Sequence, residues 1–315
     1  MRVLVLGGTQ FVGRAVTEEL VARGWDVSIL TRGIRPSAPA GIGRWYRADR
    51  RDASGWGALA GERFDAVVDV SAYAAADVEP VLDALRFDDG ARYVLVSSGA
   101  VYRPSDRPLA EDAPTGENEH WGPYGLGKLE AERLLVDRQP RCCYALSIVR
   151  PAYLYGPGNN LFREAYLFDR LERGLPVPVP SGGTRTQFAL IDDAARMLAA
   201  LAEPVRWSVE AFNCAHPEAI GWDALVRAAA RAAGVEPRIA HVGCSDALEA
   251  RSFFPFRDCT YLLDVRKAAR FGLPSPQTAL EEGMGRAYAW YRERRPALSD
   301  PKMDRIEEAL RLSGR

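Results

Sequence analysis

Residues 2–30 contain the pattern that most constrains the fold of this chain. Arg2–Gly7 is a short apolar run ending on glycine, Gly7–Gly13 is glycine-rich, Phe11–Arg23 reads as a helix, and Asp26–Leu30 is apolar again. This order predicts a strand, a tight turn, a helix and a second strand, the context in which a glycine motif indicates a dinucleotide site rather than an ordinary turn. The helix N-terminus would offer free N–H groups and a positive dipole to a pyrophosphate.

A second motif is the pair Tyr124 and Lys128, which precedes the amphipathic stretch Leu129–Leu135. Residues four apart lie on one helix face, so the ammonium can stabilise a phenolate. A free phenol titrates at about pH 10, and a lowered pKa would make Tyr124 a general base at neutral pH. The spacing alone is equally compatible with an exposed Tyr and Lys, but the glycine turn upstream favours the catalytic interpretation.

These motifs resemble those of the extended short-chain dehydrogenase/reductases, a group of nucleotide-sugar epimerases, dehydratases, reductases and decarboxylases. The resemblance spans nearly the whole chain. It also rests on Val96–Tyr102, Arg150–Gly158, Phe188–Asp193 and Leu263–Lys267. It implies that Tyr124 is the base, that Lys128 binds the nicotinamide ribose, and that Ser98 bonds the substrate's reacting oxygen.

Three departures from the family pattern bear on function. Gln10 stands where the family has its middle glycine, as in an atypical branch that begins Gly-Gly-Thr-x-Phe-x-Gly. Thr31 replaces the acid that holds a ribose 2′-hydroxyl, and Arg32 can bind a 2′-phosphate, which favours NADP unless Arg32 is simply a solvated charge. Gly99 and Ala100 replace the Asp-Glu pair of the 4,6-dehydratases, which argues against that reaction.

The resemblance also implies which residues touch the ligands. The expected cofactor contacts are Gly7, Gly8, Thr9, Gln10, Phe11, Val12, Gly13, Thr31, Arg32, Asp49, Ser71, Lys128 and Pro151. The expected substrate contacts are Asn159, Asn160, Arg185 and Gln187. Arg185 can pair with a diphosphate or be a solvated loop charge. The Thr186-Gln187 pair resembles the atypical branch more than the sugar epimerases.

The composition narrows the class of protein. The chain has 315 residues with 41 basic and 42 acidic side chains, so it lacks the basic excess that tracks nucleic-acid phosphates. Its five cysteines show no Cys-x-x-Cys spacing and its three histidines are scattered, so we expect free thiols and no metal site. The N-terminus reads as a strand rather than a leader, and no apolar run reaches membrane-spanning length, so we expect a cytoplasmic protein.

The pattern along the chain predicts an α/β fold with a Rossmann-type, doubly wound parallel sheet and a smaller C-terminal substrate lobe. After residue 30 we expect strands at 44–46, 65–70, 92–97 and 144–150 and helices near 55–60, 77–85 and 124–138, an alternation that is typical of a parallel sheet. We expect a dinucleotide-binding domain over 1–158, with 186–215 returning to it. The substrate lobe would comprise 159–185 and 216–300, and residues 301–315 would form a polar tail helix.

Three functions stay open from the sequence. The leading hypothesis is NAD(P)-dependent oxidoreduction at a sugar carbinol, as in a nucleotide-sugar epimerase. An NADPH-dependent ketoreductase shares every motif. A non-catalytic RNA- or nucleotide-binding protein is the third, because the Gly-Gly-Thr-x-Phe start is similar to that of plastid stem-loop RNA-binding proteins. We also expect a homodimer, since the apolar positions of 78–85 and 129–135 exceed what one sheet face needs.

Overall fold

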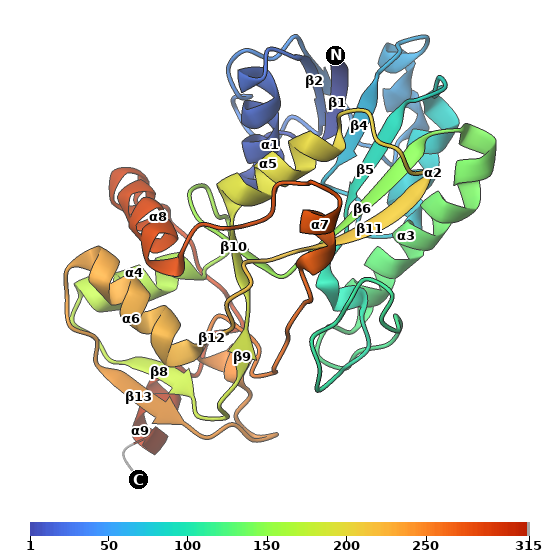
Figure 1. Cartoon of the computed structure of the whole chain (residues 1–315). Helices are drawn as coiled ribbons and strands as arrows, with labels where there is room; N and C mark the ends of the chain where they lie inside the picture. The colour runs from blue at the N-terminus through green and yellow to red at the C-terminus, as the bar shows by residue number, and fades with distance from the viewer. Residues whose placement is uncertain (314–315) are drawn as a thin grey trace. The chain divides into compact units, whose positions relative to one another are not determined.

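The computed structural model describes residues 1–313 and divides the chain into two compact units (Figure 1). The first comprises Met1–Ala152, Ile191–Ala215 and Leu263–Pro276, and the second comprises Tyr153–Leu190, His216–Leu262 and Gln277–Arg315. The first boundary therefore lies at Ala152 rather than at residue 158. Residues 263–276, expected in the smaller lobe, belong to the first unit because Leu263 bridges to Leu109 and α7 (Arg266–Arg270) packs on β11 (Val209–Cys214).

The described part of the first unit is built on a seven-stranded parallel sheet with the order β11-β6-β5-β4-β1-β2-β3. Its other strands are β1 (Arg2–Leu6), β2 (Asp26–Thr31), β3 (Arg44–Arg47), β4 (Ala66–Asp69), β5 (Arg92–Val96) and β6 (Ala145–Pro151). This confirms the predicted fold class. The strand order reverses between β1 and β4, the place where such sheets bind ligands beyond the strands' carboxyl ends.

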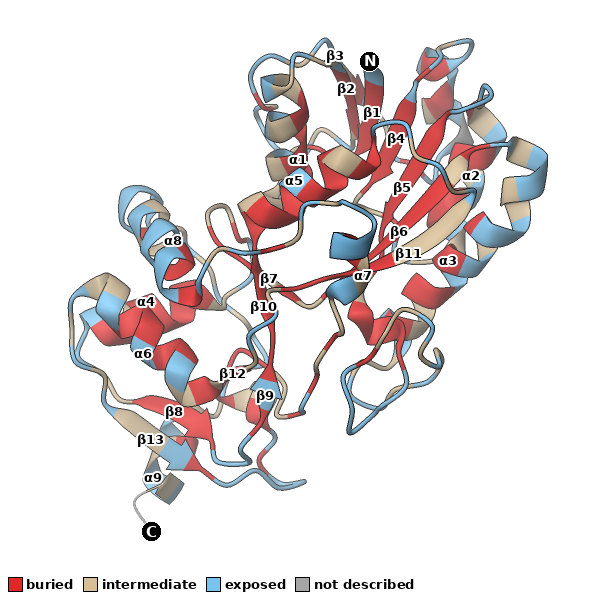
Figure 2. Ribbon diagram, in the orientation of Figure 1, coloured by how far each residue is buried: buried red, intermediate tan, exposed pale blue. Residues whose placement is uncertain are grey.

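Helices cover both faces of this sheet (Figure 1). Helix α1 (Phe11–Ala22) packs against α5 (Ile191–Leu201), and α2 (Ala75–Ala84) packs against α3 (Pro123–Cys142). Leu4 and Leu6 share a buried cluster with Val78 of α2 and Leu135 of α3. Because side chains alternate along a strand, Val3 and Val5 of β1 face the opposite layer, and Figure 2 shows the central strands buried over most of their length.

Short 3₁₀ helices complete the first unit, namely η1 (Ala53–Leu59) and η2 (Gly99–Val101). The stretch expected as a helix near Gly55–Ala60 is η1. Gly55 and Gly57 explain why this element is a 3₁₀ helix and not an α-helix, since each glycine costs about 1 kcal/mol in an α-helix.

The second unit combines four helices of the described residues with three two-stranded pairs. The helices are α4 (Glu164–Glu172), α6 (Trp222–Ala233), α8 (Leu280–Arg294) and α9 (Ile306–Ser313). The strand pairs are β7 (Tyr153–Tyr155) with β10 (Phe188–Leu190), β8 (Val177–Pro180) with β13 (Ile239–Val242), and β9 (Arg185–Thr186) with β12 (Ile220–Gly221). The expected tail helix is α9, which packs on β8 and β13. Among the described helices, none is long and apolar enough to cross a membrane.

Candidate active site

The glycine turn after β1 is shaped by close backbone approach. A Cβ on Gly13 would lie 1.9 Å from the carbonyl oxygen of Gly7, and one on Gly8 would lie 2.6 Å from Cγ2 of Ile29. Gly7 has φ +97°, a conformation that glycine adopts without strain. A side chain at any of the three glycines would therefore clash with or strain the turn. The turn lies beside the end of β4, since a Cβ on Gly7 would also contact Ser71.

Gln10 does not need to be glycine in this turn. Its backbone is extended, with φ −141° and ψ 140°, which any residue adopts. The positive φ appears one residue later, at Phe11, with φ +38°. A non-glycine residue with a positive φ is uncommon and strained. The backbone strain of this turn therefore lies at Phe11, the first residue of α1.

The N-terminus of α1 fits a pyrophosphate. Gln10 provides no side-chain cap, and the first turn holds no acidic residue. The unpaired N–H groups at such an end need an acceptor, and the helix dipole favours an anion. The residues present therefore suit the dinucleotide that the motif predicts.

Thr31 is the last residue of β2, and its side-chain hydroxyl is already used in hydrogen bonds within the protein. Its Oγ1 accepts hydrogen bonds from Nε1 of Trp45 at 2.9 Å and from the backbone N–H of Gly33 at 3.3 Å. Arg32 is exposed, and the Arg47 guanidinium lies 4.3 Å from the centroid of the Trp45 ring. In the described residues neither arginine is paired with a carboxylate. Sequence reasoning missed Arg47, although its place at the end of β3 was a usable signal.

Asp49 is exposed, and its Oδ1 accepts the backbone N–H of Arg51 at 2.9 Å, as in a turn. The next residue, Arg50, holds neighbouring segments together by several hydrogen bonds. Arg50 donates from Nη1 and Nη2 to Asp69 at 2.7 and 2.6 Å, and from Nη1 to Oγ of Ser71 at 2.8 Å. Arg50 and Asp69 are both buried, and sequence reasoning identified neither.

The Arg50–Asp69 pair holds the loop after β4. Asp69 also accepts the Tyr93 hydroxyl at 2.7 Å and the N–H groups of Ser71 and Ala72, each at 3.1 Å. Burial by itself would raise the pKa of Asp69, but the charge of Arg50 and these hydrogen bonds outweigh it and lower the pKa. The buried ion pair thus fixes Ser71, whose contact with a cofactor stays a prediction.

The first two turns of α3 carry Tyr124 and Lys128 and contact two loops. A Cβ on Gly125 would lie 2.3 Å from the carbonyl oxygen of Ala100, and one on Gly127 would lie 2.4 Å from that of Tyr73. The two glycines therefore let the helix touch both the loop after β4 and the loop after β5. This contact brings the predicted residues of three distant segments together.

Lys128 is buried, with 3% of its surface exposed, whereas Tyr124 is 43% exposed. The Lys128 Nζ donates to the carbonyl oxygens of Ala72 at 2.7 Å and Val96 at 2.8 Å. Burial lowers the pKa of Lys128 to about 8. Ser98 follows β5 and its Oγ accepts the N–H of Ala100 at 3.1 Å, so it begins η2 while its hydroxyl proton stays available.

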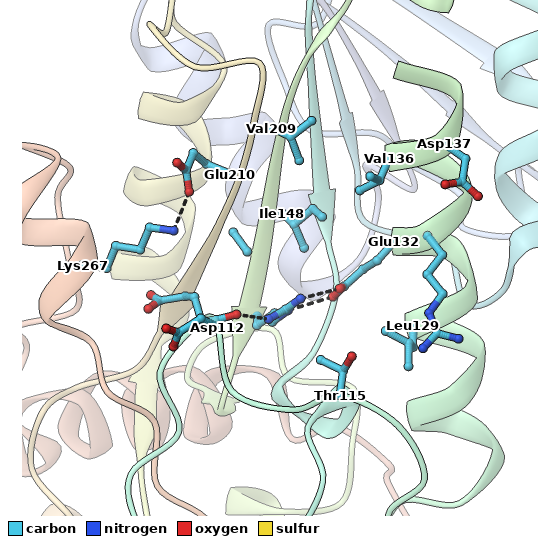
Figure 3. A pocket seen from close by; sticks show the side chains of 14 residues that line it. Asp112, Thr115, Leu129, Glu132, Val136, Asp137, Ile148, Val209, Glu210 and Lys267 are labelled. Atoms are coloured by element: carbon cyan, nitrogen blue, oxygen red, sulfur yellow. Dashed lines mark hydrogen bonds and ion pairs between the residues drawn. The ribbon is translucent and has the colours of Figure 1, made fainter. Parts of the chain in front are cut away.

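A buried ion pair lies one turn farther along α3 (Figure 3). The Arg150 guanidinium donates from Nε and Nη2 to the two carboxylate oxygens of Glu132 at 3.0 and 2.7 Å. Glu132 also accepts the Ser97 hydroxyl, and Arg150 Nη1 donates to the Tyr102 hydroxyl at 3.0 Å. This network ties α3 to the ends of β5 and β6, where Ser98 and the buried Pro151 lie.

The four predicted substrate contacts all lie in the second unit. Asn159 is buried and donates from Nδ2 to Glu164 at 2.7 Å, so its side chain supports the start of α4. Gln187 is also buried. Asn160 and Arg185 are exposed, and Arg185 donates from Nη2 to the carbonyl oxygen of Ala219 at 2.7 Å. Their contact with a substrate stays a prediction.

The apolar side chains that suggested a homodimer do not form an exposed surplus, and the homodimer stays a prediction. Almost all of the side chains that suggested it are already buried within the single chain: Val78, Val81, Leu82, Leu85, Leu129, Ala131 and Leu135. Only Leu134 of that set is half-buried. The reason is that α2 and α3 also pack against each other and not only on the sheet.

Comparison with known proteins shows which family this chain belongs to. Residues 3–215 match the model of the NAD dependent epimerase/dehydratase family. The chain belongs to this family. It is thus an extended short-chain dehydrogenase/reductase, as the sequence motifs predicted.

The individual relatives differ in what they do. The chain is 32% identical over 306 residues to the chloroplast stem-loop binding protein of 41 kDa b of Arabidopsis thaliana, covering 91% of this chain and 78% of that protein. It is 30% identical to UDP-glucose 4-epimerase of Streptomyces lividans over 50% of this chain and 53% of that one. Among solved structures, the UDP-glucose 4-epimerase of Thermus thermophilus in complex with NAD has a TM-score of 0.74 and 22% identity, covering 93% and 99% of the two chains.

Proposed function

We propose that this chain catalyses NAD(P)-dependent oxidoreduction at a sugar carbinol and that it is a nucleotide-sugar epimerase. The observation that carries the proposal is the close approach of α3 to both ligand loops, which places Tyr124 and Lys128 beside the segments of Ser71 and Ser98. Glycine at both Gly125 and Gly127 is what permits this close approach. The open N-terminus of α1 supports the cofactor half of the proposal.

The residues have distinct roles in this reaction. A bound nicotinamide supplies the hydride acceptor. Tyr124 takes the proton of the substrate hydroxyl, and its exposure leaves the phenol open to a ligand. Lys128 provides a fixed positive charge that favours the phenolate. Ser98 donates its hydroxyl proton to the reacting oxygen, and in an epimerase Tyr124 returns the proton after the ketone has turned over.

The cofactor is proposed to be NADP(H) at least as readily as NAD(H). Thr31 has no carboxylate to bind a 2′-hydroxyl, and its own hydroxyl already accepts from Trp45. Arg32 and Arg47 are the cations at this edge, and guanidinium groups bind phosphate bidentately. The pair supports a 2′-phosphate site better than Arg32 does alone.

Two other functions have specific support. A ketoreductase would use the same residues with external NADPH, and several reductases are among the relatives. Non-catalytic RNA binding is favoured by the 32% identity to the stem-loop binding protein. The balanced charge of the chain and the presence of Ser98, Tyr124 and Lys128 support the enzyme instead. A homodimer and a cytoplasmic location stay predictions.

The decisive variant is Tyr124→Phe. Loss of a general base should cut turnover by on the order of 10²-fold or more while dinucleotide binding stays nearly intact. Lys128→Ala should weaken both turnover and binding. Tyr46→Phe is the matched control, since it removes one phenol hydroxyl, which accepts from Arg44 on the edge strand β3, and it should leave turnover unchanged.

The assay also separates the alternatives. An epimerase should purify with dinucleotide bound, whereas a reductase should need added NADPH. Turnover of Tyr124→Phe near the wild-type rate on the best substrate would refute the enzyme assignment. A gel shift with stem-loop RNA that weakens as salt rises would favour the RNA-binding function.

A further inference from the structure

Tyr73 lies at the proposed site although no sequence motif points to it. It follows Ala72 in the loop after β4, and its backbone N–H donates to Oδ2 of Asp77 at 2.8 Å. Its ring centroid lies 4.6 Å from Nζ of Lys128 and 6.3 Å from the ring centroid of Tyr124. A chain separation of more than fifty residues hides this grouping from sequence reasoning.

The Lys128 ammonium has an unusual set of neighbours. It carries three N–H donors, and two of them go to the carbonyl oxygens of Ala72 and Val96. In the described residues no carboxylate lies within ion-pair distance of it. The face of the Tyr73 ring covers it instead, and Tyr73 itself is 55% exposed. One aromatic ring therefore stands at the open side of a buried ammonium.

We propose that Tyr73 is a positioning residue whose ring shields the Lys128 ammonium from water and holds it between the two carbonyls beside Tyr124. The inference rests on the proposed function for its catalytic meaning. The shielding itself is a property of the free protein and can be measured without substrate.

Two effects of the ring oppose each other. Its π face attracts the ammonium and so favours the charged form. Its bulk excludes water, and the loss of hydration disfavours the charged form. Burial is the main cause that lowers the Lys128 pKa to about 8, so we expect the exclusion of water to outweigh the attraction. At longer range Asp69, Asp77 and Glu132 favour the charged form and Arg50 opposes it.

Three substitutions separate the two effects. Tyr73→Phe keeps the ring and should leave the Lys128 pKa near 8. Tyr73→Ala admits water and should raise the pKa by about one unit or more, a tenfold or larger fall in the proton dissociation constant. Tyr73→Leu keeps the bulk without the π face and should lower the pKa further.

The measurement is the pH profile of amine acetylation, read for each lysine by peptide mass spectrometry. The lysine signals are easy to assign, because the sequence contains only Lys128, Lys267 and Lys302. A circular dichroism spectrum and a cooperative thermal transition like those of the wild type show that a variant is folded. Only the pH at which the Lys128 rate levels off is compared, so a change in accessibility alone does not affect the result.

The outcomes are distinct. A rise with Ala, a fall with Leu and no change with Phe would support the proposal. A Lys128 profile that is the same in all variants, or that moves downward with Ala, would overturn it. Because the assay contains neither substrate nor dinucleotide, failure of the Tyr124→Phe test would refute the proposed function and leave this result standing.

Discussion

Removal of the Glu132 carboxylate should destabilise the first unit strongly. In Glu132→Ala the Arg150 guanidinium would keep its burial and lose both charge-assisted hydrogen bonds, which are 3.0 and 2.7 Å long. Breaking one side of a buried ion pair costs about 3–5 kcal/mol, since an uncompensated charge stays behind. For a unit of this size that corresponds to a fall in melting temperature of roughly 6–20 °C.

A surface pair provides the control. Arg14 and Glu18 are joined at 2.8 Å, but about half of each side chain is exposed. Glu18→Ala should therefore cost no more than about 0.5 kcal/mol, since water already solvates both charges. Glu132→Gln should fall between the two, because it keeps the shape and loses the charge.

The assay is a double-mutant cycle formed by the single variants Glu132→Leu and Arg150→Met and their double variant, followed by calorimetry. Calorimetry is chosen because it can record a separate unfolding transition for each of the two units. A single two-state free energy of unfolding is not well defined for a chain with two units. The double variant Glu132→Leu/Arg150→Met should recover most of the stability, because no buried charge is left unpaired. A loss below about 1 kcal/mol in Glu132→Ala, or strict additivity in the cycle, would refute the reasoning.

Three further predictions follow from the site. Gly125→Ala should lower the free energy of unfolding by about 1–3 kcal/mol and weaken dinucleotide binding, since its Cβ would lie 2.3 Å from a carbonyl oxygen. The control Gly57→Ala has open space around its Cβ and should leave the free energy of unfolding unchanged in chemical denaturation. Arg32→Ala and Arg47→Ala should each weaken NADP(H) binding by about ten- to a hundredfold and leave NAD(H) binding unchanged, measured by titration. If neither changes NADP(H) affinity, both are solvated charges. Asp69 has a lowered folded pKa, so its contribution to stability is present above its unfolded pKa of about 3.9 and is lost as pH falls further. Asp69→Asn should flatten the acid limb of the stability profile, and an unchanged limb would contradict this.

Much of the fold follows from local patterns. Alternating apolar runs and helical stretches placed β1, α1, β2, β5 and α3 within a few residues, because strand and helix periodicities are properties of short segments. The Gly7–Gly13 turn was recognisable for the same reason. Tyr124 and Lys128 were found because one helix turn links them.

The sequence could not show which distant residues meet. The pairs Arg50–Asp69 and Glu132–Arg150 are each formed by segments that are remote along the chain, and no local pattern marks them. The same holds for the Tyr73 ring over Lys128. The apolar faces of α2 and α3 misled the dimer argument, since a sequence shows how much apolar surface exists but not what covers it.

The chain's sequence by itself determined the parallel α/β architecture, the glycine turn and the one-turn spacing of Tyr124 and Lys128, because backbone geometry and helix periodicity act over short distances. Only the tertiary structure decided that Phe11 rather than Gln10 takes the positive φ, and that Lys128 is buried between two carbonyls. Those properties depend on which loops pack together, and packing is settled by contacts between segments far apart in the chain.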